Sequence, residues 1–135
     1  MELFTLLVII LLTSVFGFWY QKSRGRIKVN ASNSQLLSGP EIGSELGDRA
    51  TLVQFSSAFC TPCRATRTLL SQVVTDYPGI KYVEIDAESN LELVRKLNIN
   101  STPTTLVLDS KGMELSRAIG APKRSDVINT LNSIR

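Results

Sequence analysis

The chain has 135 residues and is 43% hydrophobic, which excludes a fibrous or disordered protein and fits one domain of ordinary size with an appendage. Its formal net charge is +3, but residues 35–135 carry eleven basic and eleven acidic residues, so the excess lies before them. A nucleic-acid groove needs many cations on one face, so this balance argues against nucleic acid as a partner.

The chain begins with an uncharged apolar run of 18 residues, from Leu3 to Tyr20. As a helix this run would be about 27 Å long, which matches the hydrocarbon core of a bilayer. Cleaved signal peptides have a basic start and small residues at the cleavage site, whereas this run follows Glu2 and ends with three aromatic residues. We therefore predict an uncleaved transmembrane anchor over residues 1–20, with a signal peptide as the alternative.

A basic and polar stretch follows the anchor, and residues 21–34 are predicted to form a linker with a short extended piece from Arg26 to Val29. Its four cations all come after the apolar run, and basic residues are retained on the cytoplasmic side of a membrane. The prediction is a single-pass protein of the cell membrane whose domain faces the cytoplasm. An extracytoplasmic domain is the alternative.

Residues 35–135 are predicted to form the globular domain, because apolar runs of strand length alternate there with segments of helical periodicity. The expected elements are a short helix at 41–46 closed by Gly47, strands at 50–56, 80–85, 104–108 and 113–119, and helices at 60–77, after 86–89, and at 125–134. This order predicts an α/β fold with a mixed central sheet, helices on both faces, and two parallel crossovers that place Cys60 at the carboxyl end of a strand.

The three longer helices each have an apolar stripe that is expected to face the sheet. The residues of these stripes are Ala65, Leu69, Leu70, Val73, Val74 and Tyr77, then Leu91, Val94 and Leu97, and finally Val127, Ile128, Leu131 and Ile134. Pro78 and Gly79 end the first of these helices, and Gly120 and Pro122 precede the last.

Both cysteines stand at the start of the first long helix, as Cys60-Thr61-Pro62-Cys63. The helix dipole and unpaired N–H groups lower the pKa of a thiol at this place, so Cys60 is predicted to attack a substrate disulfide and Cys63 to resolve the mixed disulfide. Pro62 suits the first helical turn, where a missing N–H costs nothing. A closed zinc site needs four ligands, and the chain has no further Cys and no His, so zinc would require two chains. An inert structural pair is the other alternative to redox activity.

Four motifs in this order resemble the thioredoxin family, over roughly residues 36–134. They are Leu52-Val53-Gln54-Phe55 before Phe59-Cys60-Thr61-Pro62-Cys63, then Val83-Glu84-Ile85-Asp86, Ser101-Thr102-Pro103-Thr104 and Ile119-Gly120-Ala121. The resemblance implies a thioredoxin-like fold in which Pro103 is a cis-proline facing the cysteines and the backbone near Thr102 pairs with the substrate chain. A trans proline at a strand start is the alternative for Pro103. The implied substrate groove consists of Phe59, Thr61, Pro62, Thr102, Pro103, Gly120 and Ala121.

The chain departs from this family at three positions. Phe59 stands where the family usually has Trp, Thr61 where it has Gly, and Gln54 where it often has a buried Asp that is thought to shuttle protons for the resolving cysteine. A glutamine does not titrate, so Cys63 would rely on water or a neighbour, and no buried charge raises the thiol pKa values. We expect a lower Cys60 pKa and a less reducing potential than in a general thioredoxin. Tyr82 stands near the place of a Lys that often accompanies the Asp.

The sequence thus predicts a membrane-tethered thiol–disulfide oxidoreductase that uses the Cys60–Cys63 dithiol and needs no cofactor or metal beyond it. Its expected partners are protein disulfides, an electron donor or acceptor protein and the membrane, and the chain is expected to be a monomer. The alternatives are an extracytoplasmic oxidase, isomerase or haem-maturation reductant, and an interaction module that docks at the membrane with incidental thiols.

Overall fold

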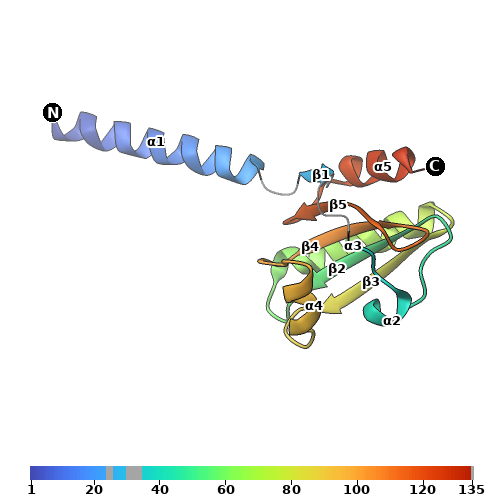
Figure 1. Ribbon diagram of the computed structural model, residues 1–135. Helices are drawn as coiled ribbons and strands as arrows, with labels where there is room; N and C mark the ends of the chain where they lie inside the picture. The colour runs from blue at the N-terminus through green and yellow to red at the C-terminus, as the bar shows by residue number, and fades with distance from the viewer. Residues whose placement is uncertain (24–25, 30–34, 135) are drawn as a thin grey trace.

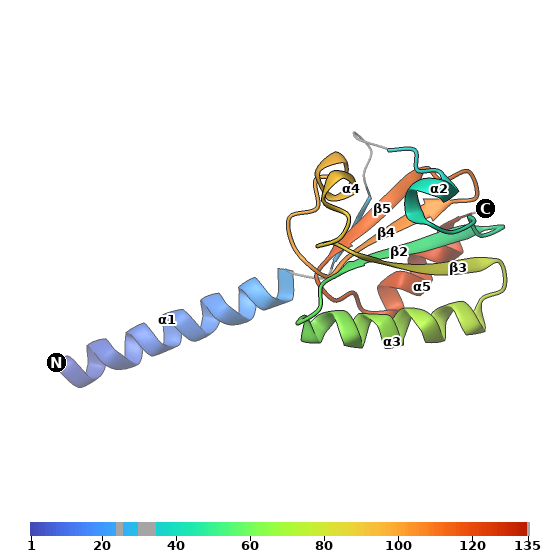
Figure 2. The ribbon, with the colours of Figure 1, turned by 90° about the horizontal axis from the view of Figure 1, so that it is seen from below.

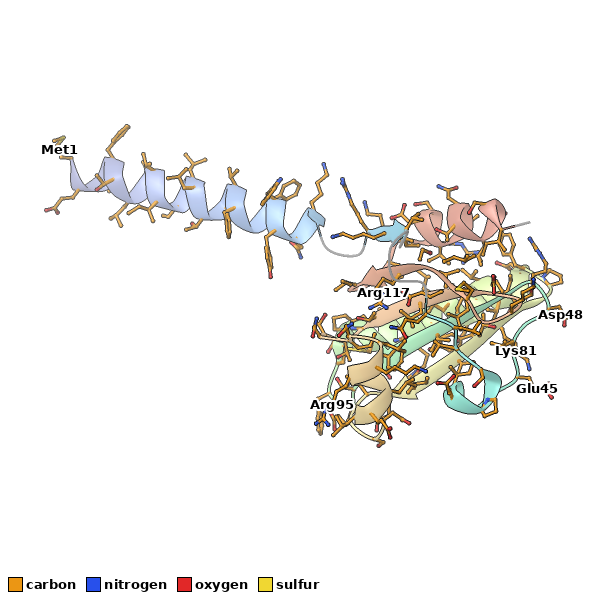
Figure 3. All side chains as sticks on the ribbon, viewed as in Figure 1. Met1, Glu45, Asp48, Lys81, Arg95 and Arg117 are labelled. Atoms are coloured by element: carbon orange, nitrogen blue, oxygen red, sulfur yellow. A yellow bond between two sulfur atoms is a disulfide. The ribbon has the colours of Figure 1, made fainter. Side chains whose placement is uncertain are left out.

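The computed structural model describes residues 1–23, 26–29 and 35–134. Helix α1 (Glu2–Ser23) stands outside the globular domain, and its apolar side chains project from every face of the helix (Figures 1 and 3). It is long and apolar enough to cross a membrane, a test that a signal sequence near an N-terminus also passes.

A five-stranded mixed sheet forms the centre of the domain, with the strand order β1-β5-β4-β2-β3. Strand β2 is parallel to β3, whereas the pairs β2–β4, β4–β5 and β1–β5 are antiparallel. All seven residues of β2 are buried, as its continuous apolar run predicts for a central strand. The strands are β1 (Ile27–Val29), β2 (Ala50–Ser56), β3 (Ile80–Asp86), β4 (Thr104–Asp109) and β5 (Glu114–Ile119).

Helices cover both faces of this sheet, as predicted (Figure 2). Alternate residues of β2 enter two separate cores: Val53 packs on the side of α2 and α4, and Leu52 on the side of α3 and α5. The helices of the domain are α2 (Gly39–Ile42), α3 (Thr61–Asp76), α4 (Leu91–Lys96) and α5 (Arg124–Ser133).

Two residues that were expected to face the sheet are exposed, Ala65 and Leu91. In α3 the buried face is set by Cys63, Thr66, Leu70 and Val73, and Ala65 lies about 100° around the helix from Thr66. The Thr66 hydroxyl can be buried because it donates a hydrogen bond of 2.9 Å to the carbonyl oxygen of Pro62. Leu91 is the first residue of α4 and is 54% exposed.

The short helix before β2 lies earlier than predicted: it spans Gly39–Ile42 and ends at Gly43 rather than Gly47. Pro40 fits its first turn, where the missing N–H has no helical partner. Gly43 then adopts the left-handed conformation, with φ of 70°, which closes the helix one turn after it began.

The prediction of two parallel crossovers is half wrong, because β4 runs antiparallel to β2 and hence to β3. The 16 residues of α3 extend about 24 Å, enough to return the chain along a seven-residue strand of about 23 Å. The six residues of α4 extend only about 9 Å. The chain therefore re-enters the sheet at the edge where β3 left it.

Glu41 links α2 to α4 across the surface of the domain. Its carboxylate binds the ammonium group of Lys96 and accepts a hydrogen bond of 2.8 Å from the backbone N–H of Ser38. The hydrogen bond from Lys96, followed by those from Ser38, lowers the pKa of Glu41 from 4.5 to about 2.

We expect Glu41→Gln to lower the free energy of unfolding at pH 7 by less than about 1 kcal/mol, because both partners of this ion pair are partly exposed. Folding lowers the Glu41 pKa, so the wild-type advantage is complete above about pH 4.5 and disappears as the pH falls toward 2. Urea unfolding at a series of pH values measures it. Glu45→Gln is the control, since Glu45 is 94% exposed at 3.7 Å from Lys81 and should change little. A Glu41→Gln deficit that persists at pH 2 would contradict this account.

Candidate active site

The two cysteines form a disulfide at the start of α3, directly after the loop that leaves β2. The sulfur atoms are 2.08 Å apart and the Cα atoms 5.2 Å apart. Cys60 caps the helix, and its Sγ accepts a hydrogen bond of 3.2 Å from the backbone N–H of Cys63. Cys63 is only 1% exposed, whereas Cys60 is half-buried. Cys60 is therefore the sulfur that a partner molecule can reach.

Two further loops meet the cysteine loop at the same edge of the sheet. The Thr102–Pro103 peptide bond is cis, as the resemblance implied, and the Thr102 hydroxyl lies 3.1 Å from that of Ser57. The backbone N–H of Gly120 donates a hydrogen bond of 2.8 Å to the carbonyl oxygen of Pro103. The structure thus brings the predicted groove segments together, although Phe59 and Ala121 are 62 residues apart in the chain.

The predicted groove residues differ in their accessibility. Pro103 is buried, while Thr102 and Gly120 are half-buried. Phe59 is 97% exposed beside Cys60, so this large apolar ring stands free on the surface of the domain. The other exposed members of the groove are Thr61, Pro62 and Ala121.

Gln54 lies behind the disulfide and is fully buried. Its amide Nε2 donates a hydrogen bond of 2.9 Å to the carbonyl oxygen of Cys63, and its Oε1 lies 2.6 Å from the Tyr82 hydroxyl. Both ends of the amide are thus occupied by neutral partners. Gln54 fixes the first turn of α3 against β2 without introducing a charge beneath the thiols.

Tyr82 connects Gln54 to a charged pair. Its hydroxyl also lies 2.9 Å from Oε2 of Glu84, and because a phenol has a single proton it can donate to Gln54 or to Glu84 but not fully to both. Glu84 in turn forms a two-pronged ion pair with Arg67 and accepts a hydrogen bond of 3.0 Å from the Ser56 hydroxyl.

The pKa values of this network follow from its geometry. Hydrogen bonding to Arg67 holds the pKa of Glu84 below its ordinary value, while partial burial, followed by the hydrogen bond to Glu84, raises the pKa of Tyr82 above its ordinary range. At neutral pH Tyr82 is therefore a neutral donor and Glu84 an anion. Glu84 also lines a cavity of about 290 Å³ together with both cysteines and Arg64. Asp86 lines this cavity too, so both of its carboxylates come from β3 rather than from β2.

A family model described as Thioredoxin matches residues 41–133, more than half of the chain. The chain belongs to the thioredoxin family. Together with the Cys60–Cys63 pair, this membership makes the protein a thiol–disulfide oxidoreductase with a thioredoxin-like fold. Among the described residues there is no group of three or more His, Cys, Asp or Glu side chains that could hold a metal ion.

Known thioredoxins share this similarity at low sequence identity. A thioredoxin H-type of Oryza sativa subsp. indica is 24% identical over 99 residues, covering 73% of this chain and 75% of the relative. The thioredoxin of Mycoplasma genitalium is 27% identical over 82 residues, covering 61% and 79% respectively. A solved thioredoxin of Nicotiana alata is 23% identical with a TM-score of 0.59, covering 65% of this chain and 75% of its own. Thioredoxin-2 of a malaria parasite is 22% identical with a TM-score of 0.60, covering 78% and 98%.

Three residues of this thioredoxin-family site were not expected from the sequence: Ser56, Arg67 and Glu84. Strand periodicity could have predicted Glu84, because it follows Tyr82 by two residues and therefore shares its face of β3. Arg67 lies four residues after Cys63 on α3 and reaches the same carboxylate. Their meeting depends on the register of β2 with β3, in which Gln54 lies opposite Glu84.

Proposed function

We propose that α1 anchors this thioredoxin-family protein in a membrane and that the domain reduces or exchanges disulfides of protein substrates there. The observation that carries the proposal is the asymmetry of the disulfide, with an accessible Cys60 at a helix start and a buried Cys63 behind it. The exposed apolar surface of α1 supports the anchor, because burial in a bilayer would remove these apolar side chains from water.

In the reducing direction the Cys60 thiolate attacks one sulfur of the substrate disulfide and forms a mixed disulfide, while the other substrate sulfur leaves and takes up a proton. Cys63 then loses its proton and attacks Cys60 Sγ, which closes the intramolecular disulfide and releases the second substrate sulfur as a thiol. Two electrons and two protons pass to the substrate. A donor protein that supplies two electrons and two protons restores the dithiol, and no other cofactor takes part.

The surrounding residues would bind the substrate chain. The backbone at Thr102 and Pro103 offers hydrogen-bonding groups to which an extended peptide can add as a strand, and Gly120 and Ala121 form another rim of the groove. Phe59, Thr61 and Pro62 contribute the exposed surface next to Cys60. We place the domain on the cytoplasmic side because the basic residues follow the span, which favours substrate reduction; protease digestion of the domain in intact spheroplasts would overturn this orientation.

Cys63→Ser is expected to accumulate mixed disulfides with substrates in membranes, because Cys60 can still attack but nothing resolves the intermediate. Non-reducing electrophoresis should show at least ten-fold more dithiothreitol-sensitive adducts than the wild type. Cys60→Ser is the matched control and should trap almost none, because Cys63 is buried. Equal trapping by the two variants would contradict the assigned roles. Full biological activity of Cys60→Ser would instead favour an interaction module with incidental thiols.

A further inference from the structure

The dithiol and the membrane anchor lie at the same edge of the sheet, the one formed by the carboxyl ends of β2 and β3. Strand β2 ends at this edge before Cys60, the antiparallel strand β4 begins there after Pro103, and β5 ends there before Gly120. Strand β1 is antiparallel to β5, so it begins at this edge too. The residue before it, Arg26, therefore lies on the same side of the domain as Cys60.

The register shows how close these points are. Ile27 pairs with Ala118, while the next residue of β5, Ile119, pairs with Thr104, which itself pairs with Phe55. The start of β1 is thus level with the end of β2. Three strand spacings separate the two strands, or about 14 Å.

The chain leaves little distance between this edge and the end of α1. Helix α1 ends at Ser23 and β1 begins at Ile27, and four residue steps extend at most about 14 Å. Lys22 is the last residue of the candidate membrane span. In both ribbon views α1 approaches the domain from the side where β2 and β3 end and α3 begins (Figures 1 and 2).

The side chains on this edge suit a bilayer surface. Lys22, Arg26 and Lys123 line a cavity of about 460 Å³ at the junction of α1 and α5, together with Asp126. Within the described part of the chain, none of these three cations forms an ion pair, so they are available to anionic headgroups. Phe59, 97% exposed, provides an aromatic ring of the kind that settles at a membrane interface.

We propose that the dithiol faces the bilayer, and that its substrates are disulfides of membrane proteins that lie close to the bilayer surface. This inference rests on the proposed function, since it requires both the anchor and an active dithiol. The short connection holds Cys60 above the membrane, where a disulfide in a neighbouring membrane protein comes within reach. A bulky soluble protein would have to enter the narrow space between the domain and the headgroups.

The test uses the full chain in phosphatidylcholine vesicles containing phosphatidylglycerol, with dithiothreitol as electron donor. The variant carries a 20-residue Gly/Ser spacer inserted after Gly25, which adds a root-mean-square reach of about 25 Å. Three disulfides are compared: a short free peptide, the same peptide linked to a lipid, and insulin. Rates are normalised to the fraction of domain that external protease digests.

Wild type and spacer variant should reduce the free peptide at rates within two-fold. The spacer should accelerate insulin reduction at least ten-fold and slow reduction of the lipid-linked peptide several-fold. Equal insulin rates in the two proteins, or an unchanged rate on the lipid-linked peptide, would overturn the membrane-facing arrangement while leaving the oxidoreductase intact. Failure of both proteins to reduce the free peptide would instead overturn the proposed function, and with it the inference.

Discussion

Arg117→Ala is expected to lower the free energy of unfolding by about 3 kcal/mol, because it removes the cation that is ion-paired with a buried carboxylate. Arg117 lies on β5 (labelled in Figure 3) and binds both oxygens of Glu114, whose side chain is 0% exposed, at 2.6 and 2.8 Å. Its third donor binds the carbonyl oxygen of Leu97 at 2.9 Å, which fastens the end of α4 to the sheet. Chemical denaturation followed by circular dichroism measures the loss.

Arg124→Ala is the matched control for this prediction. Arg124 binds Asp76 at 2.7 Å, but the two side chains are 43% and 55% exposed, so the loss should stay below about 1 kcal/mol. The double variant Glu114→Leu with Arg117→Met should regain most of the stability that Arg117→Ala loses, because it removes the buried charge altogether. If the double variant is as unstable as Arg117→Ala, lost packing rather than the buried negative charge sets the cost.

Gln54→Asp is expected to make the dithiol couple more reducing by about 30 mV, equivalent to about 1.4 kcal/mol. A carboxylate at this buried position lies next to Cys63 and disfavours its thiolate, so the pKa values of the thiols rise and the disulfide becomes relatively more stable. Equilibration with glutathione measures the potential. We expect the wild-type potential itself to be less reducing than that of a general thioredoxin.

The same substitution should cost about 3 kcal/mol of stability at pH 7, since the new carboxylate cannot donate to the Cys63 carbonyl and is buried. Burial raises the pKa of a carboxyl group at this position, so the loss is smallest at low pH and grows as the pH rises from about 4. Gln54→Asn has the same shape without the charge, and should leave the potential near the wild-type value. An equal shift in both variants would show that shortening the side chain, not charge, controls the potential.

Local signals in the sequence were sufficient for much of this structure. The apolar run of β2 followed by a helix start placed Cys60 and Cys63 correctly at a strand–helix junction, because both features depend on neighbouring residues. The extended piece predicted near Arg26 is strand β1. The cis bond before Pro103 came from the family resemblance, since nothing in the local sequence distinguishes it from a trans bond.

The features that the sequence did not reveal depend on lengths and long-range register. The direction of β4 follows from the shortness of α4. The periodicity of the apolar residues in α4 did not predict how long this helix is. The partners of Gln54 depend on the alignment of β2 with β3, and a one-residue slip would have turned Tyr82 and Glu84 to the other face. The sequence showed that Gln54 replaces an acid of the family. It did not reveal the ion pair between Glu84 on β3 and Arg67 on α3.

Strand β1 also determines where the domain can be separated from helix α1. A chain that begins at residue 35, the boundary suggested by composition, would lack the three residues that pair with Ser116, Arg117 and Ala118. The outer side of β5 would then present free N–H and C=O groups, a template for pairing with another molecule. We expect a domain without α1 to stay monomeric only if it begins at Arg26, because the segment that joins α1 to the domain also shields the sheet from self-association.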